Sequence, residues 1–127
     1  MDLSPRRFAD ALVLHPSGTL DHLTAPSFRA ALDPHLARCA ADGDRVVLDC
    51  SGVSYISSAG LRVLMLASKQ AKAQGGTIVV AALLPLPLEI FAISRFDLVL
   101  PVFGTVGEAL AEGSPAARAA FDLGGGA

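Results

Sequence analysis

The stretch VVLDCSGVSYISSAGLRVL, residues 46–64, decides the fold of this chain. It opens within an apolar, β-branched run, 45–50, of the kind that forms an interior strand covered on both faces of a sheet. The segment 51–57 reads as a loop, and a helix then runs from about Ser58 to Gln74, before Gly75 and Gly76. A buried strand that leads through a loop into an amphipathic helix indicates an α/β domain.

The sequence before this stretch repeats the same alternation. Residues 11–15 read as a strand and residues 19–21 as a short extended piece. Thr24 offers an N-cap hydroxyl for an amphipathic helix that we expect to end near 42–43, and Pro26 suits its first turn. The arm before Phe8 is short and basic.

The sequence after it predicts two more strands and two more helices. The strands are 77–82, of the buried parallel type, and 98–103, which Pro101 places at a sheet edge. The helices are 85–94, which prolines start, and 106–111, which Thr105 caps. Strands and helices that alternate in this way imply parallel strand pairs with right-handed crossovers.

The length of 127 residues suits a single domain. We place that domain at residues 1–112. Residues 113–127 are rich in Ala and Gly and read as a partly disordered tail, with disorder expected above all at 124–126.

Composition excludes several classes of function. Ten Lys and Arg against twelve Asp and Glu give a net charge of −2, so the chain lacks the basic excess that binds nucleic acid. The longest apolar run, 78–88, contains two prolines and is too short to span a membrane. Cys39 and Cys50 read as buried free thiols of a reducing compartment. These features predict a cytoplasmic protein with no direct contact to nucleic acid or membrane.

The sequence shows no constellation typical of an enzyme. Asp21 and His22 are neighbours that point to opposite faces of an extended chain, and His35 has no acid one helical turn away, so the three histidines, His15 included, read as surface residues and not as catalytic bases. No close His or Cys pair suggests a metal site, and no glycine-rich phosphate loop is present. We therefore expect a non-enzymatic protein without a cofactor.

Two serines at the predicted start of the second helix stand out. Serine is a favoured N-cap, so Ser57 and Ser58 are explained as capping residues without any function. The same place also tolerates a phosphate, because a helix N-terminus presents unpaired N–H groups and a partial positive charge. The residues alone leave both interpretations open.

Two separated motifs resemble the STAS-domain family of anti-sigma factor antagonists. GTLDHLTAPSF, residues 18–28, is similar to the G-x-L-D-x-x-T-A segment of that family. Residues 46–64 resemble its D-x-S-x-x-x-x-[DS]-S-x-G-L pattern. The resemblance covers about residues 8–112 and implies a single-domain, STAS-like mixed sheet of four to five strands with about four helices.

The resemblance also assigns functional residues. The phosphorylated serine of the family lies two positions before the motif glycine, which makes Ser58 the phosphoacceptor here. Many members have Asp before this serine and Ser or Thr after it, whereas this chain has Ser57 and Ala59, so Ser57 is a second possible acceptor. The partner-binding surface that the resemblance implies comprises Asp21, Thr24, Ser57, Ser58, Ala59, Gly60 and Arg62.

The family implies a regulatory cycle with two protein partners. The unphosphorylated antagonist binds an anti-sigma factor with serine kinase activity and releases the sigma factor, which controls transcription. The kinase then phosphorylates the antagonist, a serine phosphatase restores it, and the ATP belongs to the kinase. Whether the chain forms a homodimer stays open.

The sequence leaves two other functions open. A STAS module that is not phosphorylated would act as a ligand sensor, a scaffold or an accessory subunit of lipid transport, and the apolar segment 84–88 favours this alternative. A small hydrolase that uses Ser58 as its nucleophile is the third class.

Overall fold

The structure, a computed structural model, describes residues 1–124. Its strands are β1 (Arg6–Phe8), β2 (Ala11–Leu14), β3 (Ser17–Leu20), β4 (Arg45–Asp49), β5 (Gly52–Ile56), β6 (Ile78–Ala81) and β7 (Val102–Phe103). Its helices are α1 (Ala25–Leu36), α2 (Ser58–Ala73), α3 (Pro85–Ile93), a 3-10 turn η1 (Phe96–Leu98), α4 (Val106–Gly113) and α5 (Pro115–Leu123). Within these residues no helix is both long and apolar enough to cross a bilayer.

The main sheet has five strands in the order β1-β2-β4-β6-β7. The short edge strand β1 pairs antiparallel with β2, and the other neighbours are parallel, with Leu12 opposite Val46 and Val46 opposite Ile78. The three inner residues of the central strand β4 are fully buried, as the β-branched run predicts. The predicted α/β class with a mixed sheet is confirmed.

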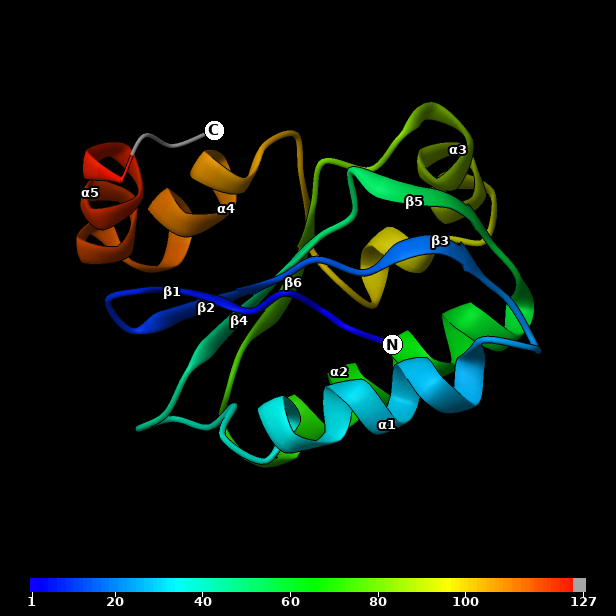
Figure 1. The fold of residues 1–127 in the computed structure, drawn as a ribbon, viewed down its shortest axis with the longest axis horizontal. Helices are drawn as coiled ribbons and strands as arrows, with labels where there is room; N and C mark the ends of the chain where they lie inside the picture. The colour runs from blue at the N-terminus through cyan, green and yellow to red at the C-terminus, as the bar shows by residue number, and fades with distance from the viewer. Residues whose placement is uncertain (125–127) are drawn as a thin grey trace.

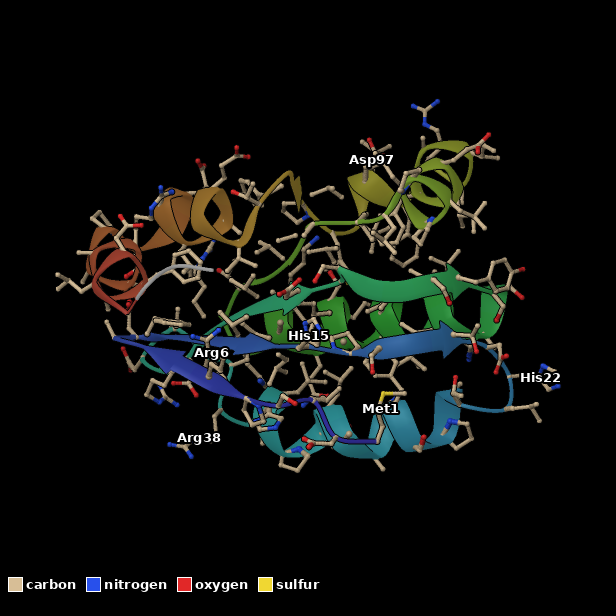
Figure 2. All side chains as sticks on the ribbon, turned by 45° about the horizontal axis from the view of Figure 1, so that its top comes forward. Met1, Arg6, His15, His22, Arg38 and Asp97 are labelled. Atoms are coloured by element: carbon tan, nitrogen blue, oxygen red, sulfur yellow. The ribbon has the colours of Figure 1, made fainter. Side chains whose placement is uncertain are left out.

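Helices cover both faces of this sheet (Figure 1). The helices α1 and α2 lie side by side on one face, α4 and α5 lie on the other, and α3 sits beside β5. A view turned by 45° shows α1 below the sheet and α4 and α5 above it (Figure 2). Each face therefore has its own apolar core.

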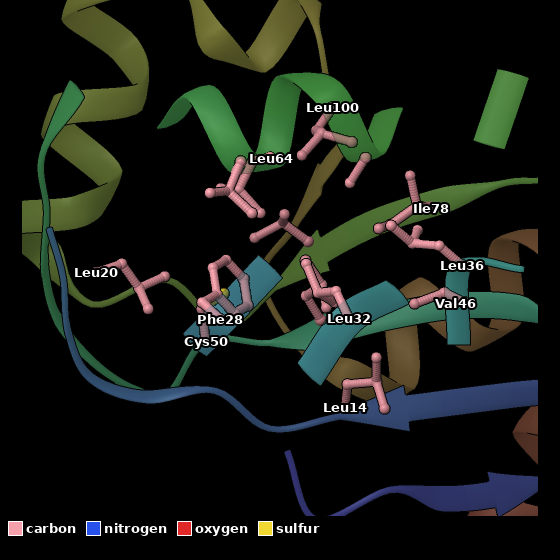
Figure 3. Close-up of a cluster of buried hydrophobic side chains, with 14 of the residues drawn as sticks. Leu14, Leu20, Phe28, Leu32, Leu36, Val46, Cys50, Leu64, Ile78 and Leu100 are labelled. Carbon is pink, nitrogen blue, oxygen red and sulfur yellow. The ribbon is translucent and has the colours of Figure 1, made fainter. Parts of the chain in front are cut away.

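The larger core lies between the sheet and the pair α1 and α2 (Figure 3). Phe28, Leu32 and Leu36 fall on one stripe of α1 and are buried there, as their spacing predicts. The core beneath α4 and α5 is smaller and includes Val47 and Val79 from the opposite face of the sheet. Strands that are buried on both faces explain why β4 and β6 read as continuous apolar runs.

The prediction of a loop at residues 51–57 is wrong for most of this segment, because residues 52–56 form the strand β5. This strand pairs in parallel with β3, with Ser17 opposite Gly52 and Leu20 opposite Ile56. Only Val53 and Ile56 of β5 are buried, so the strand lacks the regular alternation by which a half-buried strand is recognised. Gly52 suits the pairing because a Cβ there would lie 3.1–3.2 Å from His15 and Ser17 side-chain atoms.

The first helix ends at Leu36, earlier than the predicted 42–43. The side-chain amide of Gln74, just after α2, donates hydrogen bonds of 2.7 Å to the carbonyls of Leu36 and Cys39. These bonds satisfy carbonyls that a longer helix would have used internally. The Thr24 hydroxyl also differs from expectation: it does not cap α1, but accepts a bond from the Asp21 N–H and donates one to the Thr19 carbonyl.

The C-terminal part of the chain departs further from expectation. The predicted strand 98–103 is reduced to the two residues of β7, which does lie at the sheet edge, and η1 precedes it. Residues 115–123, expected to belong to a partly disordered tail, form α5. Ser114 caps this helix, and Phe121 packs edge-on against Phe8 at a ring distance of 5.2 Å. Of the residues 124–126 where disorder is expected, 125 and 126 lie outside the described part of the chain.

Both cysteine thiols are buried, as predicted. Burial raises the pKa of the Cys50 thiol to about 12. Burial likewise raises the pKa of the Cys39 thiol, whose Sγ–H donates to the Thr77 carbonyl. Neither thiol therefore ionises readily at neutral pH.

The start of α2 lies unusually close to the end of β3. A Cβ on Gly60 would lie 2.5 Å from the Leu20 carbonyl oxygen and 3.0 Å from Ile56 Cγ2. Real Cβ atoms do not approach a backbone oxygen so closely, so any larger residue must push α2 away from β3. Glycine at position 60 is required by packing.

We predict that Gly60→Ala lowers the free energy of unfolding by about 1–3 kcal/mol, the usual cost of overpacking a well-packed site. Urea denaturation followed by circular dichroism measures this loss. Gly124→Ala is the matched control, since its nearest contact would be an ordinary 3.4 Å. Equal unfolding midpoints for the two variants would contradict the packing role of Gly60.

Candidate functional site

The two motif segments meet at one end of the molecule. The Ser57 N–H donates a 2.8 Å hydrogen bond to the Leu20 carbonyl, which ties the start of α2 to the end of β3. The first turns of α1 and α2 lie at this same end, where β3 and β5 finish (Figure 1). The seven residues proposed from sequence for partner binding are thereby brought to neighbouring positions, although they come from segments more than 30 residues apart.

The two serines differ in their surroundings. Ser57 has an extended backbone and occupies the N-cap position of α2, where its hydroxyl accepts a long 3.5 Å bond from the Gly60 N–H. Ser58 is the first residue of α2 and is exposed to solvent. None of the hydrogen bonds found among residues 1–124 uses its hydroxyl. Capping therefore falls to Ser57, and Ser58 has no evident structural task.

The motif residues that follow Ser58 differ in their exposure to solvent. Ala59 is half-buried, with part of its surface open to solvent, whereas Gly60 is buried against β3. Gly60 thus offers a partner little surface, and its contribution is to let α2 approach β3. Arg62, one turn after Ser58, is exposed.

Asp21 forms a tight turn between β3 and α1. Its Oδ1 accepts hydrogen bonds from the backbone N–H groups of Leu23, at 2.9 Å, and Thr24, at 3.1 Å. The Thr24 N–H above all, and the Leu23 N–H after it, hold the pKa of the Asp21 carboxyl below its usual value. The side chain is therefore a carboxylate at neutral pH, and the hydrogen bonds described leave its Oδ2 free.

Two hollows flank Arg62. One, of about 520 Å³, lies between α2 and the segment after α3, and its lining includes Ser58, Met65, Ser94 and Phe96. The other, of about 300 Å³ and mostly apolar, lies between the first turns of α1 and α2 and is lined by His22, Ala25, Pro26, Arg29, Ala59, Arg62, Val63 and Leu66. His22 projects outward at this end of the molecule (Figure 2).

Sequence reasoning missed several residues of this surface. Met65 carries a signal that was available, since Ser58, Arg62 and Met65 follow the i, i+4, i+7 spacing of one helix face. In the structure 37% of its surface is exposed. Ser94 and Phe96 reach the hollow only through the packing of α3 and η1, which no local pattern predicts.

Other sites are present elsewhere in the described chain. A hollow of about 430 Å³ lies at the carboxyl ends of β4, β6 and β7, lined by Asp49, Ser51, Ala82, Gly104, Thr105, Val106, Gly107, Arg118, Phe121 and Asp122. Among residues 1–124 no group of three His, Cys, Asp or Glu side chains is arranged to hold a metal ion. The leucines of 84–88 are each 39–50% exposed, while Pro87, between Leu86 and Leu88, is buried.

Comparison with known proteins identifies the family of this chain. The model of the STAS domain family matches residues 3–109. BtrV of Bordetella bronchiseptica, which is named as a candidate anti-sigma factor antagonist, is 44% identical over 72 residues. That alignment covers 56% of this chain and 62% of BtrV, so the chain spans less than two thirds of this relative.

Solved structures share the fold. A candidate anti-sigma factor antagonist of Thermotoga maritima superposes with a TM-score of 0.78 at 20% identity, over 87% of this chain and 92% of that chain. SpoIIAA of Bacillus in the phosphorylated form gives a TM-score of 0.62 at 16% identity, over 86% of this chain and 96% of that chain. The fold of the structure and the family match over residues 3–109 agree: this chain belongs to the STAS domain family.

Proposed function

We propose that this chain is an anti-sigma factor antagonist that is switched by phosphorylation of Ser58. Unphosphorylated, it binds an anti-sigma factor with serine kinase activity, which frees the sigma factor for transcription. The observation that carries the proposal is the exposed Ser58 hydroxyl in the first turn of α2, which is not used by any hydrogen bond described for residues 1–124. A kinase can reach such a hydroxyl without unfolding the domain.

The relatives support this proposal. BtrV is named as a candidate anti-sigma factor antagonist, and it is the relative with 44% identity. SpoIIAA is an anti-sigma factor antagonist with structures in both an unphosphorylated and a phosphorylated form. The same fold thus accommodates a phosphate in one of its members.

Electrostatics explain how a phosphate would release the partner. A phosphoserine adds a charge of about −1.5 to −2 at neutral pH. The whole chain carries a formal charge of only −2, so the modification nearly doubles the net negative charge and concentrates it at one point. A partner surface that fits a neutral hydroxyl would then face a bulky dianion, which costs binding energy without disturbing the fold.

The docking surface that we propose surrounds Ser58. Asp21 and Thr24 contribute the turn before α1, and Ser57, Ala59 and Arg62 contribute the first turns of α2. Gly60 serves this surface indirectly, by holding α2 against β3. The two hollows beside Arg62 would receive side chains of the partner.

The remaining roles in the cycle belong to other proteins. The kinase partner binds the ATP, and a serine phosphatase removes the phosphate. In this proposal the chain itself acts without catalysis or cofactor, in the cytoplasm, where sigma factors work. Phosphate on Ser57 would have to replace the capping hydroxyl of α2, so Ser58 is the preferred acceptor.

A second function is favoured by one observation. Leu84, Leu86 and Leu88 are 39%, 50% and 47% exposed, which is unusual for three leucines in one helical turn and its flank. A STAS module that acts as a ligand sensor, a scaffold or a lipid-transport accessory subunit would use such a surface and would need no phosphate. The phosphorylation experiment below separates the two functions.

Incubation with the cognate anti-sigma kinase and ATP should add one phosphate group to the wild-type chain, as seen in its intact mass. We expect Ser58→Ala to stay unlabelled and Ser57→Ala, the matched neighbour, to be labelled. Labelling of Ser58→Ala at the wild-type level would move the site elsewhere. A wild-type chain that is never labelled would favour the unphosphorylated module.

A charge at position 58 should weaken binding without destabilising the fold. We predict that Ser58→Asp weakens binding to the kinase by about tenfold or more, because a charge that is buried against a surface fitted to a neutral hydroxyl loses its hydration without gaining a partner. Its melting temperature should not fall below that of the wild type, because Ser58 is exposed and a carboxylate is favoured in the first turn of a helix. Isothermal titration calorimetry and thermal unfolding measure the two quantities.

The control for this variant is Ala119→Asp, which adds the same charge to an exposed position of α5 at the far end of the molecule (Figure 1). We expect it to bind like the wild type. If Ser58→Asp and Ala119→Asp bind equally well, electrostatic exclusion at the start of α2 is not the mechanism.

Variants of Asp21 separate the effect of its negative charge from its effect on the turn before α1. In Asp21→Asn the side-chain oxygen can still accept the Leu23 and Thr24 N–H bonds, so the turn and the melting temperature should be retained. We expect kinase affinity to fall several-fold because the carboxylate charge is lost. Wild-type affinity in Asp21→Asn, with a loss only in Asp21→Ala, would show that the residue acts through the turn alone.

A further inference from the structure

We propose that Arg62 is the intramolecular partner of the phosphate on Ser58, so that phosphorylation both adds a dianion and withdraws this cation from the docking surface. The inference rests on the proposed function, because it assumes that Ser58 carries the phosphate. Phosphorylation would then have two effects on the same surface. The phosphate adds negative charge there, and the positive charge of Arg62 is no longer available to the partner.

Helix geometry places the two side chains together. Ser58 and Arg62 are four residues apart on α2, the spacing at which side chains lie one above the other. Side chains on a helix lean toward its N-terminus, so the Arg62 stem is directed over the turn that begins with Ser58. Both residues are exposed, and both line the 520 Å³ hollow between α2 and η1.

The surrounding charges leave Arg62 available. None of the ion pairs formed within residues 1–124 includes it, whereas Arg29, which lines the neighbouring hollow, is engaged with Asp33 at 2.9 Å. The first turn of α2 contains no acidic residue that would compete with a phosphate for Arg62. Residue 57 is a serine, so no carboxylate lies directly before Ser58 in the chain.

The chemistry of the two groups is complementary. A guanidinium presents a planar fork of N–H donors that matches two phosphate oxygens, and such charge-assisted pairs are stronger than neutral hydrogen bonds. The phosphate would also lie over the first turn of α2, where a negative charge is favoured. Before phosphorylation the same guanidinium is free to meet carboxylates or phosphates of the partner.

This arrangement predicts that phosphate stabilises the domain through Arg62. Phosphoserine incorporated at position 58 during translation provides the modified protein without any kinase. We expect it to raise the melting temperature of the wild-type chain by about 2–4 °C. In Arg62→Gln at least half of that gain should be lost, and Arg62→Lys should keep part of it.

Lys69→Gln is the matched control, because Lys69 is an exposed cation on α2 seven residues after Arg62. It should show the full wild-type gain. An equal gain in Arg62→Gln and Lys69→Gln, or no gain in the wild type, would overturn the assignment of Arg62.

Phosphorus NMR gives a second measurement that does not depend on stability. The second pKa of the phosphate should be lower in the wild type and in Lys69→Gln than in Arg62→Gln. The other charged groups near the site, Asp21 and His22 before α1, Arg29 on α1 and Arg95 beside the hollow, are the same in all three proteins. Because no kinase is used, a negative result would reject Arg62 while leaving phosphorylation of Ser58 by the kinase to its own test.

Discussion

The close contact between the start of α2 and the end of β3 is the constraint on which the site depends. The Ser57 N–H reaches the Leu20 carbonyl at 2.8 Å, and Gly60 leaves no Cβ to hold the two segments apart. This contact joins the motif around Asp21 to the motif around Ser58. Without it, the exposed serine and the turn before α1 would not share one surface.

The contact also keeps the packing of α2 independent of Ser58. The capping hydroxyl, the missing Cβ and the buried side chains of α2 all hold the helix in place, and none of them belongs to Ser58. A modification at Ser58 therefore changes the surface that a partner meets but not the packing beneath it. A domain of this size has only a small margin of stability, so this independence allows repeated modification without unfolding.

Local patterns in the sequence predicted the elements that are governed by local physics. The β-branched runs gave β4 and β6, and the stripe of Phe28, Leu32 and Leu36 gave α1. Interactions between distant segments decided the rest. The end of α1 depends on the Gln74 side chain, 38 residues after Leu36, and β5 depends on pairing with β3. The helix α5 was hidden by an Ala- and Gly-rich composition, although Ser114 and Phe121 supply a cap and an anchor.

The candidate site likewise combines residues that local motifs predict with residues that only the tertiary fold brings together. The spacing of the two motifs singled out Asp21 and Ser58, and the structure brings both to one end of the molecule. The hollow beside Ser58 could not be predicted in full, since Ser94 and Phe96 come from a different part of the chain. Gly60 was expected on the docking surface, but burial gives it a supporting place instead.

The two buried thiols have a practical consequence. The pKa of the Cys50 thiol is raised to about 12, and the pKa of the Cys39 thiol is raised as well. Neither native cysteine therefore reacts readily with a maleimide dye at neutral pH. A single cysteine introduced on an exposed surface can therefore carry a fluorescent label while both native cysteines are kept. Exchange of this protein between partners can then be followed in real time on a chain whose core is untouched.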